Sequence, residues 1–310
     1  MSTTACPVLE PSPNSPAEPR HLSVDACLNC GCRQRSLVFQ RDGYDLVRCL
    51  KCDLAYISNP PTPEELRRFY SFSNNYHRDF ATSEAAREEF LARGRLYLGY
   101  LSKHIRSGRL LDVGCSAGFF LKTARDQGWE VAGLEFSQDT ADLGRRLYDL
   151  DIRLGGLTDV ELPAESFEAV TLWDVVEHLP DPLAAMRQAH RLLAPGGYVA
   201  FSTPNIDGLY PQASLRVARP LKYWTHAEPP AHLCQFSTKT LSRLLERAGF
   251  EVVWWTTRRI PLAYSFGDPR ALLRMPKRLA YAAAFAPLAL AGPWIGRGDE
   301  VVLVARKPSA

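Results

Sequence analysis

The segment RLLDVGCSAGFFL, at residues 109–121, constrains the fold of this chain most strongly. Apolar residues on both sides of Asp112 give the pattern of a short strand that is buried on both faces. Gly114 and Gly118 bracket a tight turn, where glycine lets the backbone approach a ligand without a Cβ in the way. A strand, a glycine turn and a helix start together predict the ligand-binding corner of a doubly wound α/β sheet.

The same turn argues against one class of cofactor. A dinucleotide needs the pattern G-x-G-x-x-G, because its pyrophosphate rests on the helix N-terminus. Here Ser116 and Phe119 stand where the second and third glycines would be. Asp112, before the turn, suits a ligand that carries an amine in place of a phosphate. A βα turn that binds nothing is the alternative interpretation.

The composition fits a globular cytoplasmic protein. The 310 residues are enough for one large α/β domain and a small module, and 46% of them are hydrophobic. The net charge of +3 is too weak to predict nucleic acid as a partner. The N-terminus lacks the pattern of a secretory signal, and the proline-rich residues 1–22 predict a disordered tail.

Two C-x-x-C pairs, separated by eighteen residues, predict a zinc ribbon over residues 23–60. A hairpin turn is expected between the pairs, at Asp42-Gly43. Because the segment is too small for a core of its own, we expect a structural Zn²⁺. A redox pair and a nucleic-acid-binding finger are the alternatives. The predicted metal ligands are Cys27, Cys30, Cys49 and Cys52.

Residues 61–107 are expected to form a helical collar. Thr62 is the predicted N-cap of a first helix, with a proline at its first position, and a second helix is predicted over 84–105. These helices are expected to pack on the sheet. A sharper interpretation is that Tyr70 or Tyr76 caps the cofactor cleft.

Residues 108–310 alternate between strand and helix patterns, which predicts a mostly parallel sheet. Glu135 follows the second strand, where a carboxylate can accept hydrogen bonds from ribose hydroxyls. Insertions are expected at 206–231 and 260–298. After the first strand, further strands are predicted at Trp129–Leu134, Phe167–Leu172, Tyr198–Ser202, Val252–Thr257 and Val301–Ala305, and helices at 182–193 and 238–248.

Five motifs together resemble those of the class I S-adenosylmethionine-dependent methyltransferases, in the broad bacterial group with an N-terminal zinc ribbon. They are LLDVGCSAG, GLEFS, SFEAVTLWDVVEHLPDP, LLAPGGYVAFSTPN and PPAHLCQFSTKTLSRLLERAGFEVV. The resemblance covers roughly residues 110–258, and the ribbon extends it to residue 27. It implies a seven-stranded sheet with the last strand antiparallel, and S-adenosylmethionine as the cofactor.

The resemblance also implies the cofactor contacts. Asp112 would meet the methionine amine, and the backbones of Gly114 and Gly118 would lie along the cofactor. Glu135 would hold the ribose and Phe136 would lie against the adenine.

At the methyl-donor end, the resemblance places Trp173 and Asp174.

The chain departs from the family pattern in two places. Ser116 replaces a glycine, and the segment before the fourth strand lacks the usual acidic-small pair. Asp159 is the candidate that remains there for the adenine amine.

Asp174, Glu177 and His178 have the spacing i, i+3 and i+4, so they share one face if the chain is helical there. The resemblance implies that His232 faces the same pocket mouth. In one chemistry, His178 or His232 is a general base that removes a proton from a substrate hydroxyl. In another, Glu177 and the two histidines bind Mg²⁺ or a similar ion. Capping, packing and loop anchoring are the structural alternatives.

The expected function is S-adenosylmethionine-dependent O-methylation of a hydroxyl on a small molecule or glycan. One alternative is a metal-assisted O-methyltransferase acting on a quinone or an RNA end. The other is a non-catalytic cofactor-binding module, against which the intact Asp112, Gly114, Gly118 and Glu135 set argues.

The insertions suggest how substrate is reached. Residues 206–231 are expected to form a lid, with Tyr210, Tyr223, Trp224 and His226 available to stack on a ring. In 260–298, a basic stretch precedes an apolar segment that is too short for a transmembrane helix, which needs about 20 residues. This segment is either a helical cover or an amphipathic patch at the inner membrane face, the latter favouring a lipid-linked substrate.

Overall fold

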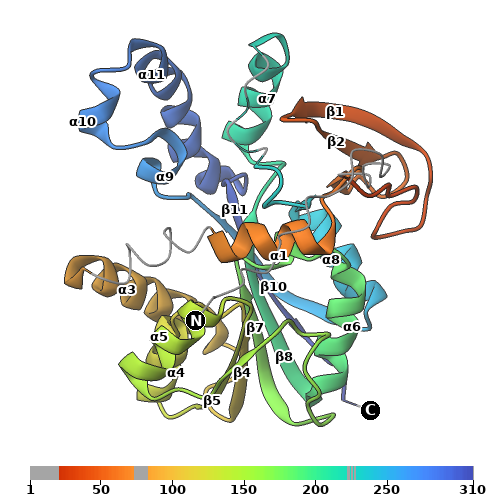
Figure 1. The fold of residues 1–310 in the computed structure, drawn as a ribbon, viewed down its shortest axis with the longest axis vertical. Coiled ribbons are helices and arrows are strands. Elements are labelled where there is room, and N and C mark those ends of the chain that lie inside the picture. Colours follow the sequence, from red (N-terminus) through yellow and green to blue (C-terminus); the bar gives the residue numbers. More distant parts are fainter. Residues whose placement is uncertain (1–20, 73–82, 222–223, 225, 227, 310) are drawn as a thin grey trace, which may run out of the picture.

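A seven-stranded sheet forms the centre of the molecule and confirms the predicted α/β fold. The computed structural model describes residues 21–72, 83–221, 224, 226 and 228–309. The strands of this sheet are β4 (Arg109–Val113), β5 (Glu130–Glu135), β6 (Ile152–Leu154), β7 (Phe167–Trp173), β8 (Leu193–Pro204), β10 (Glu251–Arg258) and β11 (Glu300–Arg306). Their order is β10-β11-β8-β7-β4-β5-β6 (Figure 1). As expected, β11 is antiparallel to both of its neighbours, and the other adjacent pairs are parallel.

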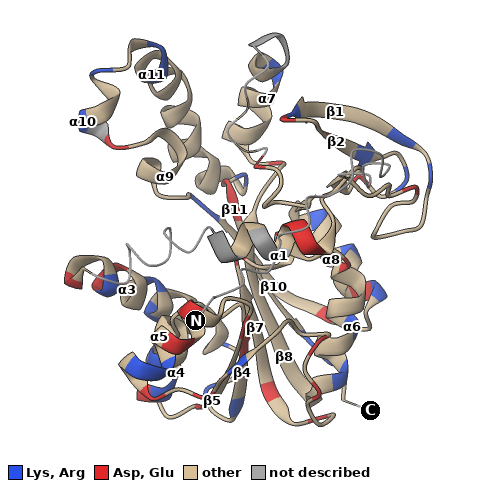
Figure 2. Ribbon diagram, viewed as in Figure 1, with Lys and Arg blue, Asp and Glu red and all other residues tan. Residues whose placement is uncertain are grey.

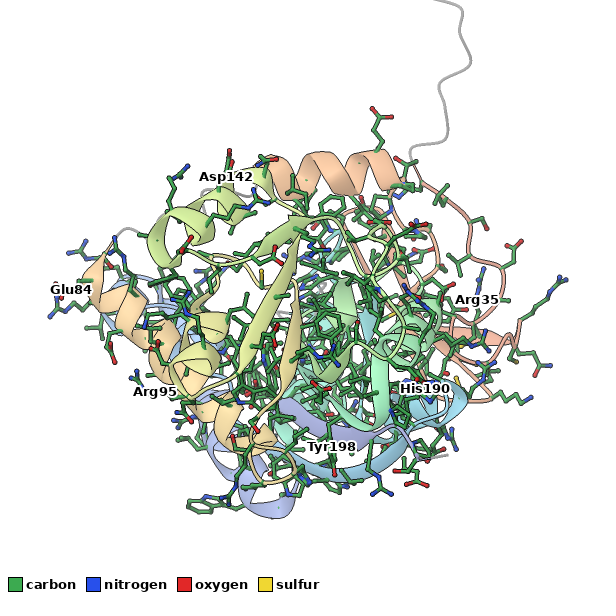
Figure 3. All side chains as sticks on the ribbon, turned by 90° about the horizontal axis from the view of Figure 1, so that it is seen from below. Arg35, Glu84, Arg95, Asp142, His190 and Tyr198 are labelled. Atoms are coloured by element: carbon green, nitrogen blue, oxygen red, sulfur yellow. The ribbon has the colours of Figure 1, made fainter. Side chains whose placement is uncertain are left out.

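Helices cover both faces of this sheet (Figure 3). Leu110 points into a core shared with α3 and α4, whereas Leu111 and Val113 point into a second core shared with α6 and α8. This division explains why the strand is apolar on both sides of Asp112. The flanking helices are α3 (Glu84–Leu101), α4 (Phe119–Asp126), α5 (Gln138–Tyr148), α6 (Pro182–Leu192) and α8 (Thr238–Arg247).

Most of the predicted strands agree with the observed ones to within a residue or two, but two strands differ. β6 was not expected, because it has three residues and only Ile152 is buried, too short a pattern to detect. β8 begins earlier than predicted, since Leu193 already pairs with Phe167 before the chain loops out and pairing resumes at Tyr198. The helix predicted over 84–105 ends at Leu101.

A second, four-stranded sheet contains the predicted ribbon. Its strands, in order, are β1 (Arg35–Arg41), β2 (Tyr44–Cys49), β3 (Ala55–Ile57) and β9 (Cys234–Gln235). The predicted hairpin is present: Asp42 and Gly43 have φ of 52° and 84°, as a two-residue hairpin turn requires. The fourth strand, β9, comes from the segment before α8, so this sheet joins chain segments far apart in sequence.

The remaining helices lie near one end of the central sheet. α1 (Pro63–Phe72) begins as predicted, because the Glu65 N–H donates to Oγ1 of Thr62 at 3.2 Å. In Figure 1, α1 lies across the end of the sheet that faces α7 and α11. The insertions contribute α7 (Leu209–Leu221), α9 (Leu262–Phe266), α10 (Pro269–Leu272), α11 (Pro276–Ala291) and the 3₁₀ helix η2 (Gly292–Ile295).

Candidate active site

Asp112 lies near the carboxyl end of β4, beneath the turn that follows. It is 3% exposed, and its Oδ1 accepts a hydrogen bond of 2.6 Å from Oγ1 of Thr171 on β7. Burial raises the pKa of Asp112 to about 8; the Thr171 hydrogen bond opposes this shift and the charge of Glu135 adds to it. A nearby cationic amine would favour the charged carboxylate, so the position suits the predicted amine contact.

The two glycines of the turn are required by conformation and by crowding. Gly114 and Gly118 have φ of 68° and 75°, in the left-handed region. A Cβ on Gly114 would lie 2.5 Å from Cγ2 of Val175, and a Cβ on Gly118 would collide with Leu150. The crowding neighbours are thus side chains of this protein. Gly114 thus lets the turn pack against the segment after β7, and Gly118 lets it pack against the segment that leads into β6.

Glu135, at the end of β5, fixes the same turn from the other side. Its Oε2 accepts a hydrogen bond of 2.8 Å from the N–H of Ser116, the residue in place of the family's glycine. Its Oε1 accepts from the N–H groups of Phe136 and Ser137, both at 2.8 Å. Ser116 has a φ of 51°, so the serine keeps the backbone shape that a glycine would adopt.

Tyr70 of α1 links the predicted adenine position to the predicted catalytic residues. Its ring meets Phe136 edge-on, with centroids 6.4 Å apart, and meets His178 in the same way at 6.0 Å. Phe136 is 46% exposed. This placement is compatible with the prediction that Tyr70 caps the cofactor cleft. Tyr76, the alternative candidate, lies outside the described residues.

Two other predicted cofactor residues are occupied in local contacts. Trp173 stacks on Tyr97 of α3, with ring centroids 4.4 Å apart and an angle of 8° between the planes. Its indole Nε1 is buried and has no hydrogen-bond partner among the described residues. Asp159 is exposed, and its Oδ2 accepts a hydrogen bond of 2.9 Å from the Gly156 N–H within its own loop. Their cofactor contacts stay predictions.

Glu177, His178 and His232 come together after β7. One potential metal-ligating atom from each residue lies within 4.8 Å of the others. Glu177 and His178 belong to the 3₁₀ helix η1 (Val176–His178), whereas His232 belongs to the segment before β9. The two imidazole rings are 4.9 Å apart. The structure thus joins three of the four predicted catalytic residues into one cluster.

A pair of backbone hydrogen bonds at Leu233 holds this cluster together. Its N–H donates to the Glu177 carbonyl at 2.8 Å, and its carbonyl accepts from the Ile57 N–H of β3 at 2.9 Å. The neighbouring carbonyl of Ala231 lies 2.8 Å from Nδ1 of His178. Residues on both sides of His232 are therefore tied to η1, and the segment is tied to the cysteine-bearing sheet.

Burial favours the uncharged forms of the cluster. It raises the pKa of Glu177 well above its ordinary range, and the nearby Asp174 charge adds to this. It lowers the pKa of His232 well below its ordinary range, with further contributions from His178 and His226. The Thr203 hydroxyl donates to Oε2 of Glu177 at 3.0 Å, while Nδ1 of His232 is buried and has no partner among the described residues. A neutral His232 is in the form that accepts a proton.

The donor set also decides which metal would fit. Two imidazole nitrogens and one carboxylate are typical ligands of first-row transition ions such as Zn²⁺ or Fe²⁺. Mg²⁺ prefers oxygen ligands and retained waters, so Glu177, His178 and His232 do not form a good magnesium site.

Asp174 differs from its predicted placement. It precedes η1 with a φ of 56°, so it does not share a helical face with Glu177 and His178. Its carboxylate forms an ion pair with Arg93 of α3 and accepts a 2.7 Å hydrogen bond from Ser202 of β8. These contacts favour a structural contribution from Asp174, and its catalytic role stays a prediction.

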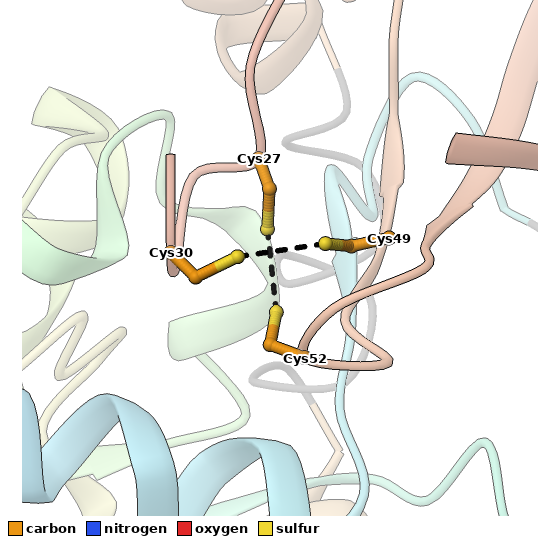
Figure 4. A group of neighbouring side chains, drawn as sticks. All are labelled: Cys27, Cys30, Cys49 and Cys52. Carbon is orange, nitrogen blue, oxygen red and sulfur yellow. Dashed lines mark hydrogen bonds between the residues drawn. The ribbon is translucent and has the colours of Figure 1, made fainter. Parts of the chain in front are cut away.

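The four predicted metal-ligating cysteines converge on one point. Figure 4 shows their side chains directed toward a common centre. Their sulfur atoms lie within 4.8 Å of one another, and the closest pairs, Cys27 with Cys52 and Cys30 with Cys49, are 3.4 Å and 3.5 Å apart. Cys32 does not belong to this cluster; its Sγ lies 3.9 Å from the Gln34 carbonyl.

The expectation that the 206–231 aromatics stack on a substrate ring is wrong for the buried ones. Tyr210 and Trp224 are fully buried. Trp224 donates from Nε1 to the Ser214 hydroxyl at 3.1 Å, and Tyr210 packs against α9 and α11. His226 packs on Tyr210, with ring centroids 4.7 Å apart. Tyr223 lies outside the described residues.

Comparison with known proteins agrees with this arrangement. Residues 83–254 match the family described as "Methyltransferase domain". A probable S-adenosylmethionine-dependent methyltransferase of Mycolicibacterium smegmatis is 34% identical over 151 residues, which cover 48% of this chain and 54% of that protein. A ubiquinone biosynthesis O-methyltransferase of Alkalilimnicola ehrlichii is 37% identical over 106 residues, which cover 31% of this chain and 42% of that protein. The chain thus spans about half the length of these curated relatives.

A solved structure shares the fold. It is the putative sarcosine dimethylglycine methyltransferase of Galdieria sulphuraria, with a TM-score of 0.53 and 16% sequence identity. The match covers 79% of this chain and 98% of that one. At this identity the likeness concerns the fold only.

Proposed function

The chain belongs to the methyltransferase-domain family, of the class I S-adenosylmethionine-dependent type, and we propose that it methylates a hydroxyl oxygen of a small molecule or glycan. The observation that carries this proposal is the cluster of Glu177, His178 and His232 beside the turn predicted to bind the cofactor. Val175, two residues before Glu177, packs against Gly114 of that turn. Relatives that act in ubiquinone biosynthesis as O-methyltransferases support oxygen as the acceptor atom.

In this proposal two carboxylates hold the cofactor, one at its methionine part and one at its ribose. Asp112, at the buried end of β4, would accept a hydrogen bond from the methionine ammonium. Glu135 accepts hydrogen bonds from the ribose hydroxyls, and Phe136 and Tyr70 border the adenine. Val175 of the segment after β7 packs on Gly114 of the turn, so residues of that segment would border the reacting end of the cofactor.

The chemical step is a direct displacement. When bound, S-adenosylmethionine would supply an activated methyl group, which the acceptor oxygen would take up as the carbon–sulfur bond breaks, with S-adenosylhomocysteine as the leaving group. The hydroxyl proton would pass to neutral His232, which lies beside Glu177 and His178 in the cluster. His178 and Leu233 position His232: Nδ1 of His178 lies 2.8 Å from the Ala231 carbonyl, and the Leu233 N–H donates to the Glu177 carbonyl. Alignment of the reacting atoms supplies much of the remaining rate.

A metal-assisted O-methyltransferase acting on a quinone is the second candidate. The convergence of two imidazoles and a carboxyl group within 4.8 Å favours it, as do the relatives from ubiquinone biosynthesis. Glu177, His178 and His232 would hold a transition ion, which when bound lowers the pKa of a coordinated hydroxyl.

We further propose that the four cysteines bind a structural Zn²⁺. Four converging thiols match the tetrahedral ligand set of structural zinc. The ion would stabilise β1–β3 and, through the β3–β9 pairing, the segment that carries His232.

We predict that S-adenosylhomocysteine binding releases close to one proton per site at pH 7. With a pKa of about 8, Asp112 is mostly protonated in the free protein, and binding the ligand's ammonium favours its carboxylate. For the same reason, affinity should rise as pH increases toward 8. Titration calorimetry in buffers of different ionisation enthalpy measures the released proton.

The control for this measurement is a second carboxylate variant. Asp112→Asn should release no proton and bind about tenfold or more weakly, because it loses a charge-assisted contact. Asp159→Asn should still release the proton, whatever its affinity. Equal proton release by wild type and Asp112→Asn would refute the assignment of Asp112.

We predict that His232→Ala lowers turnover by about 100-fold or more, the usual size of a general-base contribution. The acceptor is first identified by a transfer screen over quinones, nucleotide sugars and lipid-linked saccharides. His190→Ala, on α6, is the matched control and should keep its activity. Unchanged turnover of His232→Ala at saturating substrate would exclude both catalytic roles of His232.

The same assay separates the two candidate chemistries. With His232 as the base, chelation that leaves the cysteine-bound zinc in place, as elemental analysis verifies, leaves turnover unchanged. In the metal-assisted mechanism, chelation abolishes turnover and a transition ion restores it. Glu177→Gln should then also lose metal binding, measured directly by elemental analysis.

We predict one Zn²⁺ per chain in the purified protein, measured by elemental analysis. Cys27→Ser should lose the ion and lower the melting temperature, since zinc binding contributes to folding. Cys32→Ser, a cysteine next to the cluster but outside it, should keep both. Retention of full zinc by Cys27→Ser, or its loss from Cys32→Ser, would contradict the proposed ligand set.

A further inference from the structure

The insertion at 260–298 forms a helical lobe, defined as α9, α10, α11 and η2. Its inner side has a small apolar core, in which Phe266 and Phe285 pack on Tyr210 of α7. In Figure 1 the lobe stands away from the central sheet, next to α7. The apolar residues on the inner side of the lobe are therefore explained by packing within the protein, whereas those on its outer side are not.

The outer side of the lobe is apolar along its length. Leu279, Leu290, Trp294 and Ile295 are 40%, 45%, 89% and 61% exposed. Exposed Ala283 and Pro287 complete the row, whose steps from Leu279 to Trp294 are three or four residues and keep it on one face, and Ile295 follows directly. Leu273 and Met275, in the turn before α11, are also exposed. A continuous exposed apolar surface in a folded protein marks an interaction site.

Positive charge borders this apolar surface. Residues 259–298 contain six basic residues and one acidic residue, although the net charge of the whole chain is only +3. Arg270, Arg274, Lys277 and Arg278 are exposed around α10 and the start of α11. Figure 2 shows this blue colour at α10 and at the outer end of α11.

We propose that the helical lobe docks on an anionic lipid surface, with its apolar row in the lipid and its basic residues at the headgroups. An exposed apolar helix face beside lysine and arginine is the pattern of a helix that lies in a membrane interface. Each basic residue near an anionic surface adds to the attraction. Among the described residues, no helix is long and apolar enough to cross a membrane.

The charge distribution argues against a second copy of the chain as the occupant. In a symmetric dimer the same patch is used by both subunits. Such a contact through the lobe would place the four exposed basic residues of each copy at the interface, with only Asp268 of the same lobe to offset them. An anionic lipid surface supplies the missing negative charge.

One helix of the lobe lies toward the predicted methyl-donor end of the site. Burial raises the pKa of Tyr264 on α9, and the charges of Glu89 and Asp174 add to this shift. Resting on the function proposed above, this placement points to an amphiphilic substrate, whose hydroxyl-bearing headgroup reaches the site while its apolar part stays in the membrane. A quinone or a lipid-linked saccharide has this chemistry.

Flotation with vesicles tests the docking surface. Full-length protein should float with vesicles of equimolar phosphatidylglycerol and phosphatidylcholine, and should not float with phosphatidylcholine alone. Lys277→Glu/Arg278→Glu should lower the partition coefficient at least tenfold, because two favourable charges become repulsive. Trp294→Ser/Ile295→Ser should lower it to a similar extent. The matched control is Lys122→Glu/Arg146→Glu, on α4 and α5, which should float like wild type.

Several results would overturn the proposal: wild type that does not float, variants of the lobe that float like wild type, or a control that fails to float. Concentration-dependent dimers that Trp294→Ser/Ile295→Ser abolishes would identify a second copy as the occupant instead. Circular dichroism confirms that each variant is folded. S-adenosylhomocysteine binding is measured on the same samples without vesicles, so the failure of the membrane contact is distinguished from failure of the proposed enzyme.

Discussion

The candidate active site depends on how the backbone of Leu233 is held. Its N–H bonds to Glu177 after β7, and its carbonyl bonds to Ile57 of the small sheet. These two hydrogen bonds fix the neighbouring His232 against His178. Because buried backbone groups are costly to leave unpaired, His232 cannot move away from the cluster without breaking contacts on both sides. The cysteine-bearing sheet is therefore part of the support of the candidate site.

The central sheet supplies the other half of the site. Parallel strands place their carboxyl ends at one edge, so the residues after β4, β5 and β7 meet there. This rule is why Asp112 and Glu135 could be selected from the sequence, whereas Glu177 was selected by its spacing from Asp174 and His178. The fold was also predictable, because the apolar strands, the glycine turn and the cysteine pairs are all local patterns in the sequence.

What the sequence did not reveal are contacts between segments far apart in the chain. The hydroxyls of Thr171 and Thr203, which donate to Asp112 and Glu177, lie in strands whose pattern shows only apolar burial. The pairing of Arg93 with Asp174 joins residues that no local motif connects. Trp224 was misjudged because an aromatic residue in a long loop has the same local pattern whether it is buried or exposed. Such contacts follow from tertiary packing, which periodicity does not encode.

The central claim is that the methyl donor faces the cluster of Glu177, His178 and His232. A crystal structure with S-adenosylhomocysteine bound would measure this directly. We predict that the amine contacts Asp112, and that a methyl group extended from the sulfur points into the space beside His232, with room for an acceptor oxygen about 3–3.5 Å from its carbon. A sulfur atom directed away from the cluster, or a ligand bound elsewhere on the sheet, would contradict the claim.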